Sequence, residues 1–261
     1  MSIKIKKPKL NTALSGTALC STAVMMLCSL NAVADEKRTY RGDIELGAAI
    51  TTGNSETASA KTAVNVEQDF TDWRTEYMID AQYQRSQFKN DQGESERETT
   101  EQQIFVSYQG NYKLAKETET FFVYGAYNDE RFNGYNYQLT TAVGYGWRFY
   151  ETGNNTIDLE IGPGLSLNEL DDGTKRQGGI FRGAFTYEQE LTVATKFRQE
   201  LVTDLSFSGE NSITKAESSM IAQINGQLAM RFSFLLEYNT KPQEERRKID
   251  TETGITLVYS F

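Results

Sequence analysis

Segments of about ten residues that alternate apolar and polar side chains run through this chain and restrict its fold. The last thirteen residues illustrate the pattern, because Ile255, Leu257 and Phe261 fall on one face of an extended backbone. Asp250 and Glu252 fall on the other face, since strand side chains repeat every two residues. This alternation indicates β-strands with one apolar and one polar face.

About twelve such segments follow one another from Tyr40 to the C-terminus, each joined to the next by a polar connection, which is typical of a membrane-spanning barrel. We therefore predict an all-β fold, a transmembrane antiparallel up-and-down β-barrel. The fifth segment is apolar on both faces, so its orientation stays open. The segments are 40–50, 57–70, 74–85, 101–114, 120–128, 137–149, 156–167, 178–188, 195–207, 215–228, 232–239 and 249–261. In the tenth, we expect Met220, Ala222, Ile224 and Leu228 to face outward.

The connections between segments form two alternating classes. The short class, which we expect on the periplasmic side, comprises 71–72, 115–119, 151–155, 191–194 and 229–231. The longer and more charged class, which we expect outside the cell, comprises 51–56, 86–100, 129–136, 168–177, 208–214 and 240–248. An even number of strands places both chain ends on one side.

The N-terminal residues 1–34 carry four lysines and then a small, apolar stretch that ends on Ala32-Val33-Ala34. This pattern predicts a secretory signal peptide. Residues 35–261 then form one outer-membrane barrel domain, without cysteine and therefore without disulfides. The loss of four lysines and no acids changes the formal net charge from -9 to -13, which argues against nucleic acid as a partner.

Aromatic residues concentrate near the predicted strand ends, as expected for the two interfacial girdles of a membrane barrel. One predicted girdle contains Phe70, Trp73, Tyr77, Trp147, Phe149, Tyr187, Phe197 and Phe261, and the other contains Tyr83, Tyr137, Phe181, Phe207 and Tyr238. A soluble antiparallel sheet remains an alternative, because it shows the same alternation with its apolar face turned toward a core. Taken with the signal peptide and the two classes of connection, the girdles favour the outer membrane.

Three stretches resemble the YdiY-like family of salt-induced outer-membrane proteins. They are Gly53-Asn-Ser-Glu-Thr57, the stretch from Asp129 to Tyr137 that leads into Gly144-Tyr-Gly-Trp-Arg-Phe149, and the stretch from Asp250 to Phe261. The terminal Phe also resembles the C-terminal signal that the barrel-assembly machinery reads. The family resemblance implies a link to salt or osmotic stress and supplies no catalytic residues.

The chain contains no histidine. Ser-His hydrolysis and imidazole metal sites are therefore excluded, and we assign no catalytic, cofactor or metal site. Catalysis by two carboxylates stays chemically open, and Asp129-Glu130 and Asp171-Asp172 are adjacent acids in predicted loops. Solvated acids of this kind are common in loops, so we expect no enzyme.

Acids outnumber bases on the predicted inward face. The candidate selectivity residues are Asp43, Glu45, Glu67, Asp80, Asp158, Glu160, Arg148, Arg182, Arg198, Glu200, Asp250 and Glu252. Charged rings of this sign favour cations in a channel. We therefore expect a narrow passive channel with modest cation preference. A closed structural barrel, whose lumen is filled by ion pairs, is the alternative, and a barrel of this size fits either.

The expected partners are outer-membrane lipid, lipopolysaccharide and the barrel-assembly machinery. The outer loops mix acids with cations such as Arg97, Lys175 and Arg247, which can pair with lipopolysaccharide phosphates. Simple solvation of these loops is the alternative. The oligomeric state and the transported solute stay open.

Overall fold

The computed structural model describes residues 39–51, 56–89, 95–116, 118–130, 134–209, 211–242 and 247–261. The signal peptide predicted at 1–34 lies outside the described residues. No helix in the described part of the chain is long and apolar enough to cross a membrane. The strands are β1 Thr39–Thr51, β2 Glu56–Asp69, β3 Trp73–Lys89, β4 Ser95–Lys113, β5 Glu119–Glu130, β6 Tyr135–Thr152, β7 Asn155–Leu170, β8 Lys175–Thr192, β9 Thr195–Ser206, β10 Ile213–Gln223, β11 Leu228–Asn239 and β12 Ile249–Ser260.

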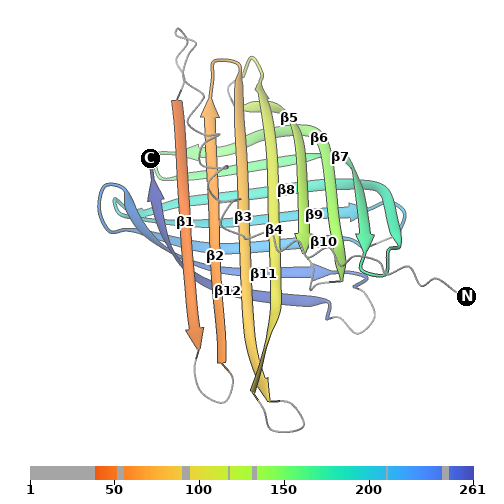
Figure 1. The fold of residues 1–261 in the computed structure, drawn as a ribbon. Helices are drawn as coiled ribbons and strands as arrows, with labels where there is room; N and C mark the ends of the chain where they lie inside the picture. Colours follow the sequence, from red (N-terminus) through yellow and green to blue (C-terminus); the bar gives the residue numbers. More distant parts are fainter. Residues whose placement is uncertain are drawn as a thin grey trace, which may run out of the picture. The chain divides into compact units, whose positions relative to one another are not determined.

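Each strand pairs antiparallel with its neighbours in the chain, and β12 pairs with β1 to close a barrel (Figure 1). This confirms the predicted antiparallel up-and-down barrel of about twelve strands. Gly42 and Phe261 meet at one end and exchange two backbone hydrogen bonds, of 3.0 and 2.9 Å. We call this end the terminal rim and the opposite end the loop rim. The connections from even-numbered to odd-numbered strands lie at the terminal rim.

Apolar side chains cover the outside of the barrel. In β12, Ile255 and Leu257 expose 63% and 45% of their surface, whereas Thr256 and Val258 expose 5% each. Successive strand residues point to opposite faces, so the exposed set faces outward and the buried set faces the lumen. A soluble sheet would bury its apolar face, so the outward position of these residues contradicts the soluble alternative.

The structure resolves the orientation of β5, which the alternation leaves open. Phe121 and Val123 are 54% and 51% exposed on the outside, and Phe122 between them is 1% exposed. Phe122 and Tyr124 therefore face the lumen. The barrel interior contains large aromatic side chains that a purely polar lumen would lack.

The predicted turn at 229–231 is wrong. These residues belong to β11, and the reversal occurs at 224–227 instead. The side chain of Asn225 accepts hydrogen bonds from the backbone N–H groups of Gln227 and Leu228, at 3.1 and 3.0 Å, which is the usual way Asn stabilises a turn. Ile224 consequently lies in the turn, and Arg231 lies within the wall.

The predicted loop at 86–100 is much shorter in the structure, because β3 continues to Lys89 and β4 begins at Ser95. The two strands have 17 and 19 residues, more than the roughly ten that cross a bilayer. The connection predicted at 168–177 also contracts, to a turn at 171–174 in which Gly173 has a φ of 82°.

Glycine allows a close approach between β6 and β7. A Cβ atom on Gly144 would lie 2.7 Å from the Phe122 ring and would overlap the carbonyl oxygen of Ile161. Gly144 lies in the stretch where the β6–β7 ladder is interrupted, between the residue pairs Ala142↔Gly164 and Tyr145↔Ile161. Glycines at such positions allow a barrel wall to bend sharply.

Candidate functional site

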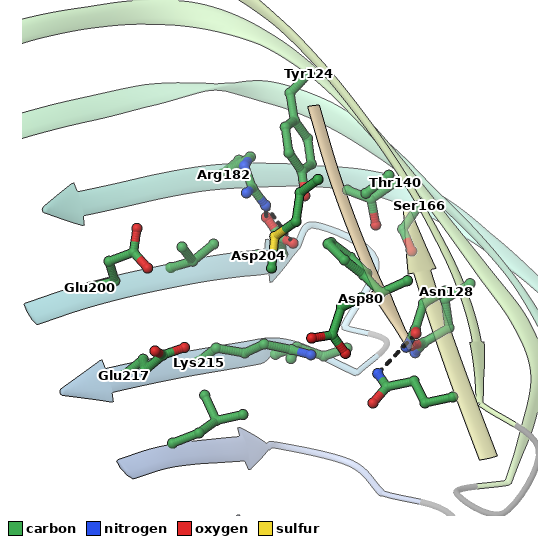
Figure 2. Close-up of a pocket in the computed structure, with 18 of the residues that line it drawn as sticks. Asp80, Tyr124, Asn128, Thr140, Ser166, Arg182, Glu200, Asp204, Lys215 and Glu217 are labelled. Carbon is green, nitrogen blue, oxygen red and sulfur yellow. Dashed lines mark hydrogen bonds and ion pairs between the residues drawn. The ribbon is translucent and has the colours of Figure 1, made fainter. Parts of the chain in front are cut away.

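The described part of the barrel contains a lumenal cavity of about 280 Å³, lined by at least one residue from each strand from β2 to β12 (Figure 2). Its lining combines charged and apolar side chains. The charged residues are Lys61, Asp80, Arg182, Glu200, Asp204, Lys215, Glu217 and Glu252. The apolar and aromatic residues are Met78, Phe105, Tyr124, Ala126, Ile180, Val202, Ile213 and Leu235.

Arg182 connects two parts of the cavity wall. Its Nη1 atom donates to both carboxylate oxygens of Asp204, at 3.0 and 3.1 Å, and its guanidinium carbon lies 3.8 Å from the ring centroid of Tyr124 (Figure 2). Arg182 lies on β8 and Tyr124 on β5, so the cation–π contact joins strands that are not neighbours. Arg182 is only 8% exposed, and its Nε atom is buried without a hydrogen-bond partner.

Two lysines of the cavity pair with acids in different ways. The Nζ atom of Lys61 on β2 lies 3.0 Å from Glu252 on β12 and 3.9 Å from Asp80 on β3. The Nζ atom of Lys215 lies 2.9 Å from Glu237, which is its direct neighbour in the β10–β11 ladder. The first pair therefore crosses β1, and the second joins adjacent strands.

Arg231 bridges acids on two other strands. It donates to Glu45 on β1 at 2.6 Å and to Glu217 on β10. The hydroxyl of Thr256 on β12 donates to the same Glu45 carboxylate, at 3.1 Å. Glu45 is 7% exposed, so both hydrogen bonds lie in a largely buried setting.

Nearer the terminal rim, acids accept hydrogen bonds from neutral groups. Gln109 donates to Glu160 at 2.7 Å, and Asn111 donates to Glu76 at 3.3 Å. The hydroxyl of Ser260 donates to Asp43 at 2.5 Å. The lumen therefore combines carboxylates that have cationic partners with carboxylates that have neutral ones.

The structure separates the predicted selectivity residues into groups. Asp80, Arg182, Glu200 and Glu252 line the cavity. The others lie elsewhere along the lumen: Glu45 with Arg231, Asp43 with Ser260, Glu67 near Arg74, Arg148 with Asp158, Arg198 with Glu188 and Glu200, Glu160 with Gln109, and Asp250 opposite Glu237 in the β11–β12 ladder. Their role in selectivity stays a prediction.

Several lumen residues were missing from the predicted set. The inward orientation of Lys215 and Glu217 can be predicted from the outward position of Met220, because odd-numbered residues of β10 must then face inward. Tyr124 carried no such signal, since its segment is apolar on both faces. Arg231 was hidden by the misplaced turn. In the described ranges, no group of three or more Cys, Asp or Glu side chains is arranged to hold a metal ion.

Solved structures share this architecture. The chain aligns with the COG4313 outer membrane channel from Pseudomonas putida F1 at 7% identity and a TM-score of 0.50, covering 90% of this chain and 98% of that one. It also aligns with the NanC porin, at 9% identity and a TM-score of 0.49, covering 84% and 97%. The first likeness shows that the fold is that of an outer-membrane barrel.

The translocator domain of the autotransporter NalP from Neisseria meningitidis aligns at 9% identity and a TM-score of 0.46, covering 94% of this chain and 95% of that one. No curated protein matches the chain. The family DUF481, described as a protein of unknown function, matches residues 44–261. This match fits the resemblance to the YdiY-like family. The chain therefore belongs to the DUF481 family.

Proposed function

We propose that this protein is an outer-membrane β-barrel that acts as a narrow passive channel with a modest cation preference. The charge balance of the lumen carries the proposal. Each of the following lumen cations has an acid partner: Lys61, Arg74, Lys113, Arg148, Arg182, Arg198, Lys215 and Arg231. Three of these cations are each shared by two acids, which leaves negative charge in surplus: Lys61 by Asp80 and Glu252, Arg198 by Glu188 and Glu200, and Arg231 by Glu45 and Glu217.

The outward surface supports placement in the outer membrane. Even the shortest strand, β10, has 11 residues, and about 9–11 suffice to cross the hydrocarbon core. Aromatic side chains pair on the outside near the terminal rim, with ring centroids 5.1 Å apart for Trp73–Tyr112 and 6.4 Å apart for Tyr259–Phe261. In this placement the terminal rim faces the periplasm, and lipid and lipopolysaccharide surround the wall.

Planar-bilayer recordings across a KCl gradient test the proposal. We expect small conductance steps with a reversal potential on the cation-selective side. The double substitution Glu200→Gln and Glu217→Gln should move the reversal potential toward zero, because it removes charge from the cavity wall without a large change of shape. The matched control is Glu98→Gln, at an exposed position of β4. Anion preference, or no conductance at all, would contradict the proposal.

A closed structural barrel is the second candidate. Two features favour it. The side chain of Phe122 faces the lumen and is only 1% exposed, and the Arg182–Tyr124 contact joins two strands across the lumen. In a closed barrel the wild-type protein conducts no ions, and Phe122→Ala creates a conductance that was absent. Neither candidate assigns catalysis to the barrel. The link to salt stress is tested by growth of a deletion strain at high osmolarity.

A further inference from the structure

The barrel wall has one short seam. β1 and β12 pair only from Asp43↔Ser260 to Leu46↔Leu257, in addition to the Gly42–Phe261 hydrogen bonds at the rim. Beyond this point, residues 47–51 pair with β2 alone, and residues 249–256 pair with β11 alone. In Figure 1, the first part of β12 runs across the direction of β1, and its last part turns to run beside β1.

An unpaired edge inside a bilayer is costly, because each unsatisfied backbone group in hydrocarbon costs several kcal/mol. Barrels normally close to remove such edges. The ladder ends at Leu46, and the strands are still close at Gly47, where a Cβ atom would lie 2.9 Å from Cγ2 of Thr256. Arg231 and Thr256 both donate to Glu45 and hold the paired end of the seam. The unpaired stretch beyond it needs another group to hold it.

An ion pair spans this seam on the lumen side. Lys61 is the direct ladder neighbour of Gly47, and its Nζ atom reaches Glu252 on β12 at 3.0 Å. Gly47 has no side chain to obstruct that path. The two side chains are 30% and 33% exposed, so they can separate into solvent. Lys61 and Glu252 thus form a latch between β2 and β12 where β1 and β12 have no ladder.

The latch adjoins the cavity, because Lys61, Asp80 and Glu252 all line it. The wall beside them is apolar: Met78 lies two residues from Asp80, and Leu235 is the ladder partner of Glu252. Passage of ions needs no such apolar surface. Pockets for small molecules are mostly apolar with a few charged groups, and a cavity of about 280 Å³ lies just below their usual size range of about 300–1,000 Å³.

We propose that the β1–β12 seam is a lateral portal, latched by Lys61 and Glu252, through which a small amine-bearing amphiphile passes between the membrane and the cavity. This inference rests on the proposed function. The acids around the cavity match the amine, and Met78 and Leu235 match the apolar body. Ion conduction along the barrel axis and entry of the amphiphile through the seam are separate properties, so they can be measured independently on one sample.

The test uses a disulfide across the seam. Residues 35–261 lack cysteine, so the pair Gly47→Cys and Thr256→Cys adds the only thiols in that range. A Cβ on Gly47 lies close enough to Thr256 to suit a disulfide. The matched control is Ser219→Cys with Ser233→Cys, two facing serines of the β10–β11 ladder.

The probe is dansylcadaverine, a fluorescent amine-bearing amphiphile, added to the full chain in nanodiscs. We expect oxidation of the seam pair to slow probe association by about tenfold or more, and reduction to restore it. The control pair should give equal rates in both states. Equal rates for the seam pair, or no probe binding by the wild-type protein, would overturn the portal. Loss of KCl conductance alone would overturn only the proposed channel.

Lys61→Met provides a second test that leaves the backbone unchanged. Without the latch, we expect probe association to be about threefold faster or more. Lys215→Met is the matched control, since Lys215 also lines the cavity and pairs with an acid, but between adjacent strands. An equal acceleration by both variants would show a general charge effect and contradict the latch. Heat-dependent gel migration verifies that each variant folds.

Discussion

Replacing Arg231 with Met should weaken the closure of the barrel. The arginine donates to Glu45 at 2.6 Å and to Glu217, and its side chain is 18% exposed. Removal leaves two carboxylates without their cation, and Glu45 keeps only the hydroxyl of Thr256 among its partners described above. Breaking a buried pair from one side costs about 3–5 kcal/mol, and partial exposure favours the lower value of roughly 3 kcal/mol.

Urea unfolding in lipid vesicles, followed by tryptophan fluorescence, measures this loss. With a slope of about 2 kcal/mol per M, the midpoint should fall by roughly 1.5 M. The triple variant Arg231→Met, Glu45→Gln and Glu217→Gln should recover most of the loss, since no unpaired charge remains. Arg247→Met, at an exposed position, is the control. A midpoint within about 0.3 M of wild type for Arg231→Met would refute the reasoning.

Two further predictions concern the β6–β7 contact and the turn between β7 and β8. Gly144→Val should lower the free energy of unfolding by about 1–3 kcal/mol through overlap with Phe122, whereas Gly153→Ala, with no atom within 4 Å of the new Cβ, should have little effect in the same assay. The backbone N–H of Thr174 donates to Asp172 and lowers the pKa of its carboxyl. The ionised carboxyl of Asp172 therefore stabilises the folded turn fully at pH values above its ordinary pKa. This stabilisation is lost as the pH falls through the lowered pKa, so the backbone N–H of Thr174 should lose its protection from hydrogen exchange in that pH range. Unchanged protection would contradict this assignment.

Part of the lumen is predictable from local sequence, because the side-chain period of a strand needs only neighbouring residues. Once Leu201 and Leu205 are taken as outward, Glu200 and Asp204 must face inward. The period fails where both faces are apolar, as around Phe122. It also fails at strand ends, where the reversal into β11 lies at 224–227 rather than at the predicted 229–231.

The alternation along the chain is therefore sufficient to predict an antiparallel barrel, its approximate number of strands and the face of most side chains, since these depend on local backbone geometry. The partners of the lumen charges depend on closure. Lys61 meets Glu252, 191 positions away, and Arg231 meets Glu45, 186 positions away. Such contacts arise from the stagger between β1 and β12, which no local pattern encodes. The same stagger leaves the seam short and places the Lys61–Glu252 latch beside the cavity.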